Sequence, residues 1–465
     1  MYKDKIRKYF EDHRDEMLSD IAKLVAIDSQ RTEAKDGMPY GEGVFKALST
    51  ALSMSEKYGF YTKNWENHVG TASLYNDDER ALEIMVHLDI VPPGEGWTKT
   101  EPFVMKEIDG RIYGRGTADD KGPAVAALYA MRAIKELEIP LSKNVRIMFG
   151  CDEECYSEDI KYYFSKTEPA DMTFSPDADF PVINIEKGLY YGMMKGKLKS
   201  DGKKSVISIS AGEKDNVVPG KAYASIKGFK PNEIESIVAE VENITGTTIE
   251  LTERGEILDI LVKGVPAHAS TPEEGCNSDT ALLELLKRIN LDKSELSDAI
   301  ETLSEMFPHG DTNGTAAGVY AADDESGEIT VSLNIMKYDG ENFEAVYDSR
   351  MPICSTYKSM DPIRNKAAEI GLEFEDDFLP PHYVPSDSEF VKTLIASYEK
   401  YSGNKGEAKA MGGATYVHGI KNAVAFGAAL EGEDNKMHGA DESAVIDTLL
   451  MSGMIFADAI YQLCK

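Results

Sequence analysis

Cysteine is scarce in this sequence, and long apolar runs are missing from it. The 465 residues include five scattered cysteines: Cys151, Cys155, Cys276, Cys354 and Cys464. An odd, dispersed set does not make a disulfide framework, so we expect reduced thiols and a cytoplasmic location. Cys151 and Cys155 lie close together, but no second Cys/His pair has the spacing of a structural zinc site. We therefore interpret both as packing residues.

Two further shortages exclude classes of partner. Nowhere do about eighteen apolar residues follow one another, which excludes a membrane-spanning helix, and the first ten residues lack the apolar core of a secretory signal. Cationic residues are few: 50 Lys and Arg stand against 81 Asp and Glu, a formal charge of -31. Such an acidic body repels nucleic acid and anionic membranes, so we exclude both as partners.

What is present describes a soluble globular protein, with 42% hydrophobic and 28% charged residues. The chain is too long for one ordinary core and predicts two or three domains. In the first part, apolar spacing predicts helices over 1–27 and 43–58. Strands that read as buried cover 82–91, 145–149 and 171–174, and a helix lies between the first two. This alternation predicts an α/β domain whose central, mostly parallel sheet is flanked by helices.

The pattern changes after about residue 188. Strands with alternating polarity are expected at 207–210, 257–262 and 331–335, with helices between them at 231–243, 278–290 and 295–306. They indicate an inserted α+β domain with a half-exposed antiparallel sheet. From about residue 380 the first domain resumes and ends in a helix over 442–463. We therefore divide the chain into a first domain of 1–187 and 380–465, with an insertion over 188–379.

Seven polar side chains stand at or just after the expected ends of strands or in the turn before a helix. Open α/β sheets bind their ligands at the carboxyl ends of the strands. Any one of these acids, taken alone, would indicate only a solvated surface. Taken together they indicate a site: His87, Asp89, Asp119, Glu153, Glu154, Asp177 and His438.

Imidazole and carboxylate ligands without cysteine suit zinc, and also manganese or cobalt. Two metal ions about 3.5–4 Å apart need a group that spans them, and a carboxylate has two oxygens to do so. We expect Asp119 to be that group, with one histidine and one carboxylate on each metal. Within the pair Glu153-Glu154, one carboxylate could bind a metal while the other faces the water as a base. Asp89 could hydrogen-bond His87 and fix its tautomer.

Six segments carry a resemblance to a known family. They are 85–92, 114–122, 152–154, 175–181, 264–270 and 437–438, which read MVHLDIVP, GRGTADDKG, DEE, SPDADFP, GVPAHAS and MH. With them the chain resembles the di-metal peptidase family of carnosinases, aminoacylases and succinyl-diaminopimelate desuccinylases. Within that family it is most similar to the PepV-type bacterial dipeptidases, often called Xaa-His dipeptidases.

The resemblance implies a division of the metal ligands. His87 and Asp177 would hold one metal, Glu154 and His438 the other, and Asp119 would bridge. The family has a cis peptide bond after its bridging aspartate, so we expect one after Asp119.

The resemblance also implies the catalytic and substrate-binding residues. Glu153 would be the general base, Asp89 would support His87, and the insertion would be a lid whose His268 stabilises the oxyanion. The implied substrate contacts are Asn216, Arg350, Gly413 and Thr415. One position departs from the family pattern: His418 stands where we expect arginine in the glycine-rich loop.

From these observations we expect a cytoplasmic dipeptidase for unblocked dipeptides with two zinc ions per chain, manganese or cobalt being possible substitutes. The attacking water would lie between the metals and lose its proton to Glu153. By the resemblance, the long insertion supplies its lid histidine within one chain, so we expect a monomer. Two alternatives stay open: an N-acyl or N-succinyl amino acid deacylase with the same chemistry, and a non-catalytic binding protein.

Overall fold

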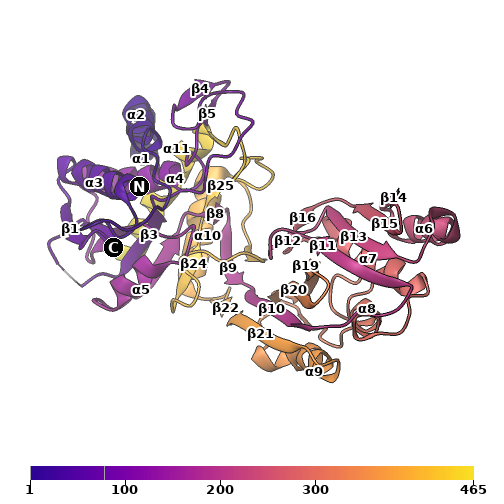
Figure 1. The fold of residues 1–465 in the computed structure, drawn as a ribbon. Coiled ribbons are helices and arrows are strands. Elements are labelled where there is room, and N and C mark those ends of the chain that lie inside the picture. The colour runs from indigo at the N-terminus through magenta and orange to yellow at the C-terminus, as the bar shows by residue number, and fades with distance from the viewer. Residues whose placement is uncertain (1, 78) are drawn as a thin grey trace. The chain divides into compact units, whose positions relative to one another are not determined.

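The computed structural model describes residues 2–77 and 79–465. They form two compact units (Figure 1). The first unit is assembled from three stretches, Met1–Ile185, Tyr383–Lys409 and Ala414–Lys465, and the second comprises Glu186–His382 and Ala410–Gly413.

The first unit is built on a sheet whose strands follow the order β1-β2-β6-β3-β7-β24-β9. Their bounds are Tyr61–Trp65 (β1), Val69–Ser73 (β2), Leu82–His87 (β3), Val145–Gly150 (β6), Met172–Ser175 (β7), Val182–Glu186 (β9) and Ala423–Ala425 (β24). The four middle strands, β6, β3, β7 and β24, are mutually parallel, and β1, β2 and β9 pair antiparallel. The predicted sheet, parallel over most of its width, is confirmed in these middle strands. β3 and β6 are buried along their whole length, as their runs rich in apolar residues predict, and each carries one charged residue, Glu83 or Arg146.

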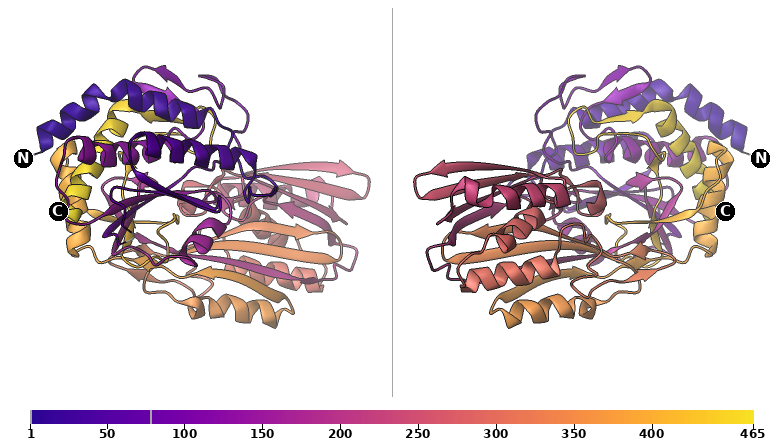
Figure 2. Two further views of the ribbon diagram at one scale, coloured as in Figure 1. Left: turned by 90° about the vertical axis from the view of Figure 1, so that its left-hand side faces the viewer. Right: turned by 90° about the vertical axis from the view of Figure 1, so that its right-hand side faces the viewer.

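Helices flank this sheet. They are α1 (Lys3–Asp12), α2 (Arg14–Val25), α3 (Glu42–Lys57), α4 (Lys121–Glu136), α5 (Glu158–Phe164), α10 (Glu389–Ser402) and α11 (Ile446–Cys464). The first and last helices, α1 and α11, lie side by side (Figure 2). The ring centroids of Tyr2 and Tyr461 are 5.1 Å apart, and Phe10 packs on Gly453. Short strands complete the unit: β4 (Lys106–Ile108), β5 (Arg111–Tyr113), β8 (Ala178–Asp179), β25 (Ala428–Ala429) and β26 (Ser443–Val445). Two further strands, β22 (His382–Tyr383) and β23 (Ala408–Met411), cross the boundaries between the units.

Two predicted helices have different bounds. The single helix expected over 1–27, whose first residue lies outside the described residues, is two helices that meet at His13. Its apolar periodicity continues through the break, so periodicity alone does not reveal it. The last helix begins at Ile446 rather than at residue 442, because Ser443–Val445 pair with β5 as a strand.

The second unit contains an eight-stranded sheet of order β14-β15-β13-β11-β19-β20-β10-β21. Its strands are β10 (Gly188–Lys197), β11 (Ser205–Ala211), β13 (Lys221–Lys227), β14 (Thr248–Arg254), β15 (Ile257–Lys263), β19 (Thr330–Tyr338), β20 (Asn342–Met351) and β21 (Glu373–Leu379). All neighbouring pairs are antiparallel. The predicted antiparallel α+β character is therefore confirmed.

Its other elements are α6 (Pro231–Thr245), α7 (Ser278–Arg288), α8 (Glu295–Met306), α9 (Asp361–Glu369), β12 (Val217–Val218), β16 (Ala267–His268), β17 (Ala322–Asp323), β18 (Gly327–Glu328) and the 3₁₀ turns Pro272–Glu274 and Tyr357–Met360. α7 packs on the sheet and is buried along its apolar side, and this unit has a hydrophobic core of its own. Across the described parts of the chain, we find no helix with both the length and the apolar composition needed to cross a bilayer.

Candidate metal centre

The carboxyl ends of three parallel strands deliver most of the predicted site. β3 ends at His87, β6 leads into the turn that holds Glu153 and Glu154, and β7 leads to Asp177. Asp119 lies in the turn before α4. The peptide bond that follows it is cis, which confirms the prediction.

Asp119 lies between two histidines. Its Oδ1 is 2.9 Å from Nε2 of His87, and its Oδ2 is 2.9 Å from Nε2 of His438. Each imidazole has a second carboxylate nearby: Asp177 Oδ2 lies 3.7 Å from His87, and Glu154 Oε2 lies 3.4 Å from His438. One buried carboxylate thus presents one oxygen to each of two His–carboxylate pairs.

These distances suit two metal ions. In the group His87, Asp119 and Asp177, and in the group Asp119, Glu154 and His438, the donor atoms lie within 4.8 Å of one another. Donors at about 2.0–2.2 Å from a tetrahedral ion are separated by comparable distances. Glu154 also keeps a buried Oε1 that has no hydrogen-bond partner among the described residues, which is costly unless a cation compensates it. The donor set therefore fits a divalent metal in each group.

The pKa shifts of the acids in the centre also favour bound cations. Burial and the neighbouring carboxylates raise the pKa of Glu153 and of Asp177 well above their ordinary values. Burial opposes the charge on Asp119 as well, but hydrogen bonds with His438 and His87 hold its pKa well below the ordinary value. Several buried acids surround these two imidazoles, so bound cations would relieve their mutual repulsion.

Asp89 is placed to organise both the histidine and the glutamate turn. The backbone oxygen of Asp89 lies 3.1 Å from Nδ1 of His87, and its Oδ1 lies 3.5 Å from the same nitrogen. The two carboxylate oxygens accept the backbone N–H groups of Glu153 and Glu154, at 3.2 and 3.0 Å. The contact with the histidine was expected from sequence, whereas the hold on the glutamate turn was not.

A second support of that turn was missed from sequence. The hydroxyl of Tyr416 donates to buried Asp159, and the same carboxylate accepts the backbone N–H groups of Cys151 and Asp152. Tyr416 lies in the glycine-rich loop, so the sequence places it near the candidate site. No sequence pattern indicates a role for Asp159. The Tyr416 ring lies so close to the backbone that only glycine fits at position 150. A Cβ there would lie 2.2 Å from the tyrosine hydroxyl oxygen.

In the second unit, the predicted lid histidine and asparagine are neighbours. His268 is exposed, and its strand β16 pairs with β12. Strand β12 begins directly after Asn216. The N–H of Ser270 donates to Nδ1 of His268 at 3.2 Å. A neutral histidine that accepts at Nδ1 carries its proton on Nε2. His268 therefore has an Nε2–H group of the kind that an oxyanion needs.

Arg350 also lies in the second unit, and it is buried. Its Nε and Nη2 bind the two oxygens of Asp348 at 2.8 and 2.7 Å, and Nη1 donates to the carbonyl of Gly412 at 2.8 Å. Gly412 in turn approaches Ser270 so closely that a Cβ would lie 2.7 Å from the serine Cβ. Arg350, the glycine pair that ends in Gly413, and the segment around His268 are thus brought together.

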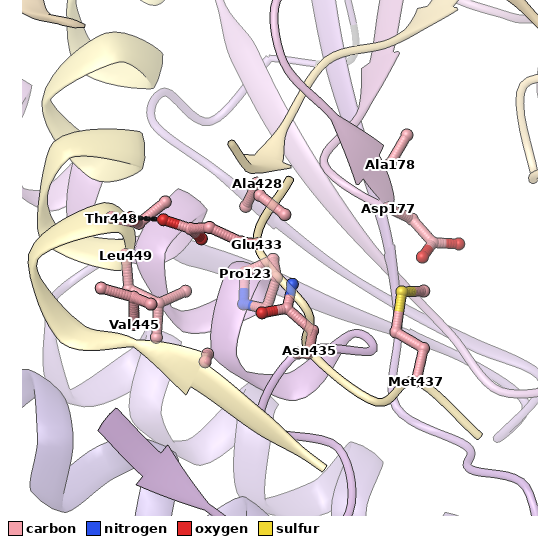
Figure 3. A pocket seen from close by; sticks show the side chains of 13 residues that line it. Pro123, Asp177, Ala178, Ala428, Glu433, Asn435, Met437, Val445, Thr448 and Leu449 are labelled. Atoms are coloured by element: carbon pink, nitrogen blue, oxygen red, sulfur yellow. Dashed lines mark hydrogen bonds between the residues drawn. The ribbon is translucent and has the colours of Figure 1, made fainter. Parts of the chain in front are cut away.

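Thr415 and His418 belong to the first unit, where the N–H of His418 donates to the carbonyl of Thr415 at 3.0 Å. A small pocket in the same unit is lined by residues that include Asp177, Glu433, Asn435 and Thr448 (Figure 3). Inside it the Thr448 hydroxyl donates to Glu433 at 2.6 Å, and the carboxylate of Asp177 points away from this pair.

Comparison with known proteins identifies one family, one sequence relative and two structural neighbours. The model of peptidase family M20/M25/M40 matches residues 84–462. A Beta-Ala-Xaa dipeptidase of Lactobacillus delbrueckii subsp. lactis is 35% identical in an alignment 465 positions long that covers 97% of each chain. Human carnosine dipeptidase 1 superposes with a TM-score of 0.61 at 16% identity, over 100% of this chain and 99% of that one. An aminoacylhistidine dipeptidase of Vibrio alginolyticus gives 0.59 at 14%, over 97% and 96%. The two structural likenesses show a shared fold.

Proposed function

Because the chain belongs to peptidase family M20/M25/M40 and is a metal-dependent peptidase, we propose that it is a dipeptidase that hydrolyses unblocked dipeptides with two zinc ions. The observation that carries the proposal is the position of Asp119, whose two oxygens each lie 2.9 Å from a different imidazole. The name of the Lactobacillus relative, which matches almost end to end, supports dipeptides as the substrate class.

The proposed ligands follow the two groups around that carboxylate. His87 and Asp177 would hold one ion, Glu154 and His438 the other, and Asp119 both. Manganese or cobalt would suit the same donors. When bound, the ions would polarise the scissile carbonyl and lower the pKa of water towards about 7.

Glu153 is the proposed general base. It takes a proton from the attacking water, whose oxygen then bonds to the scissile carbonyl carbon. As the C–N bond breaks, Glu153 passes that proton to the departing amine, so it ends the cycle ionised as it began. Asp89 would hold both the base and His87 in place through the hydrogen bonds described above.

Residues of the second unit would bind the substrate. His268 would donate its Nε2–H to the oxyanion, with Asn216 beside it. Hydrogen bonds to described residues engage four of the five N–H groups of Arg350. We therefore propose that the fifth, on Nη1, donates to the C-terminal carboxylate of the dipeptide. The loop residues Gly413 and Thr415 would complete the substrate contacts, and the second unit would act as a lid.

We also propose a cytoplasmic location and a monomeric state. All five cysteines are free thiols, in keeping with a reducing cytoplasm. The second unit carries a lid histidine of its own, in keeping with a monomer that needs no partner chain.

The alternative is an N-acyl or N-succinyl amino acid deacylase, because the same centre would cleave any amide. The zinc-loaded protein should be assayed on Ala-Ala and β-Ala-His, and on N-acetyl and N-succinyl amino acids of the same C-terminal residues. We expect kcat/KM to be higher for the free dipeptides. Preference for the acylated substrates would overturn the dipeptidase assignment in favour of the deacylase.

A further inference from the structure

One buried ion pair lies beneath the segments that carry the proposed metal ligands. Nη1 of Arg115 donates to Oε2 of Glu442, and the two side chains are 1% and 0% exposed. The pair joins the turn before α4 to the loop before β26, and both belong to the first unit.

Glu442 holds the backbone of the bridging aspartate. Its Oε1 accepts the N–H of Ala118 at 2.9 Å and the N–H of Asp119 at 3.3 Å. Its own backbone oxygen accepts the N–H of Gly114 at 3.0 Å. The carboxylate therefore fixes the turn from which the Asp119 side chain projects towards both imidazoles.

Arg115 ties two other ligand segments to the same point. Nη2 donates to the carbonyls of Pro92 and Pro93, at 3.2 and 3.3 Å, in the loop that follows His87. It also donates to the carbonyl of Gly439, at 3.1 Å, directly after His438. One guanidinium thus connects the segments of both histidines.

The His438 segment needs such an anchor. The histidine side chain is 57% exposed, whereas that of His87 is 1% exposed. The backbone of His438 has a φ of +60°, and Lys436 and Asp441 also have positive φ, a conformation that side chains with a Cβ disfavour. Packing alone therefore does not fix this ligand, and the bond from Arg115 to the next residue restrains it.

We propose that Arg115 and Glu442 are positioning residues that hold Asp119 and His438 ready to receive two cations; this rests on the proposed two-metal function. A buried ion pair contributes little net stability compared with apolar residues, so stability alone does not account for it. Holding ligands in place before binding removes an ordering cost that would otherwise weaken metal affinity.

The test compares two buried ion pairs of the first unit. Glu442→Gln keeps an oxygen for the two backbone amides but removes the charge that holds Arg115. The control is Glu83→Gln, whose carboxylate is 0% exposed and pairs with Arg80 at 3.1 Å. Glu83 lies near the start of β3, and its carboxylate accepts hydrogen bonds from Arg80 and Tyr163. The readouts are calorimetric zinc titration, the visible absorption of the Co²⁺-loaded protein, and urea unfolding without metal.

We expect Glu442→Gln to weaken binding of the second ion by about 10–100-fold and to change the Co²⁺ spectrum. Glu83→Gln should lose stability in urea but keep the wild-type metal affinity and spectrum. Arg115→Lys keeps a buried charge and should show the same metal-binding defect as Glu442→Gln. It replaces Glu442→Gln in the test if Glu442→Gln does not fold.

Equal metal affinity and spectra in wild type, Glu442→Gln and Arg115→Lys would overturn the positioning role and leave the two-metal function intact. A metal defect of equal size in Glu83→Gln would overturn it as well, because the effect would then be general. A wild-type protein that binds fewer than two ions would instead overturn the proposed function, and the positioning role with it.

Discussion

Replacing Asp119 by asparagine separates the bridge from the rest of the centre. Asparagine keeps one oxygen, but its amide nitrogen has no lone pair for a cation. Because the two carboxylate oxygens face different histidines at 2.9 Å each, the variant can complete only one of the two groups. We expect the group of His87 to keep its ion, since that histidine is buried, and the group of the exposed His438 to lose it.

The expected loss of metal affinity follows from the role of the carboxylate oxygen that asparagine lacks. Removing a residue that only supports a ligand costs about 10–100-fold in metal affinity. Removing the ligand itself should therefore cost at least about 100-fold, or about 2.7 kcal/mol, at the weaker position. The assay is zinc titration of chelated protein by calorimetry, with bound metal counted by mass spectrometry after dialysis.

The adjacent residue provides a matched control. Oδ2 of Asp120 accepts the N–H of His87 at 3.2 Å, and an asparagine oxygen can accept the same bond. Asp120→Asn should therefore keep two ions. Wild-type affinity for two ions in Asp119→Asn, or loss of an ion in Asp120→Asn, would refute the bridge.

Three other predictions concern single side chains. Glu153→Gln should lower kcat by about 10²–10⁴ while two ions stay bound, and near-normal turnover would show that another group is the base. His268→Ala should lower kcat by about 10²–10³, and a change confined to KM would argue for substrate binding instead. Burial raises the pKa of Asp159 from 3.8 to about 7, so between these values the folded chain holds a proton that the unfolded chain does not. The free energy of unfolding should then fall as pH rises through this window. In urea unfolding, the free energy of unfolding of the wild type should fall by up to about 2.7 kcal/mol between about pH 5 and pH 8, relative to that of Asp159→Asn. A difference in stability between the two proteins that stays constant with pH would contradict this.

The positions of the candidate ligands could be predicted because parallel strands deliver their carboxyl ends to one edge of a sheet. His87 ends such a strand, and Asp177 follows another. Two short runs rich in apolar residues, which form β3 and β6, were enough to identify the strands and hence the edge. The cis bond after Asp119 came from the resemblance and not from any local pattern.

The supports of the site could not be predicted in the same way. Glu442 meets Arg115 across 327 positions of sequence, and Tyr416 meets Asp159 across 257. Such contacts leave no periodicity, since each depends on how distant loops pack. Arg350 illustrates a further limit: the resemblance implies that it contacts the substrate, but its Nε and Nη2 are already bonded to Asp348.

We propose above that two ions in the centre around Asp119 drive peptide hydrolysis. Its most direct test is to remove metal with a chelator, add back zinc, manganese or cobalt in measured equivalents, and follow Ala-Ala cleavage. We predict that activity is lost on chelation and returns fully only as the second equivalent binds. Full activity with one equivalent per chain, or activity that survives complete removal of metal, would contradict the account.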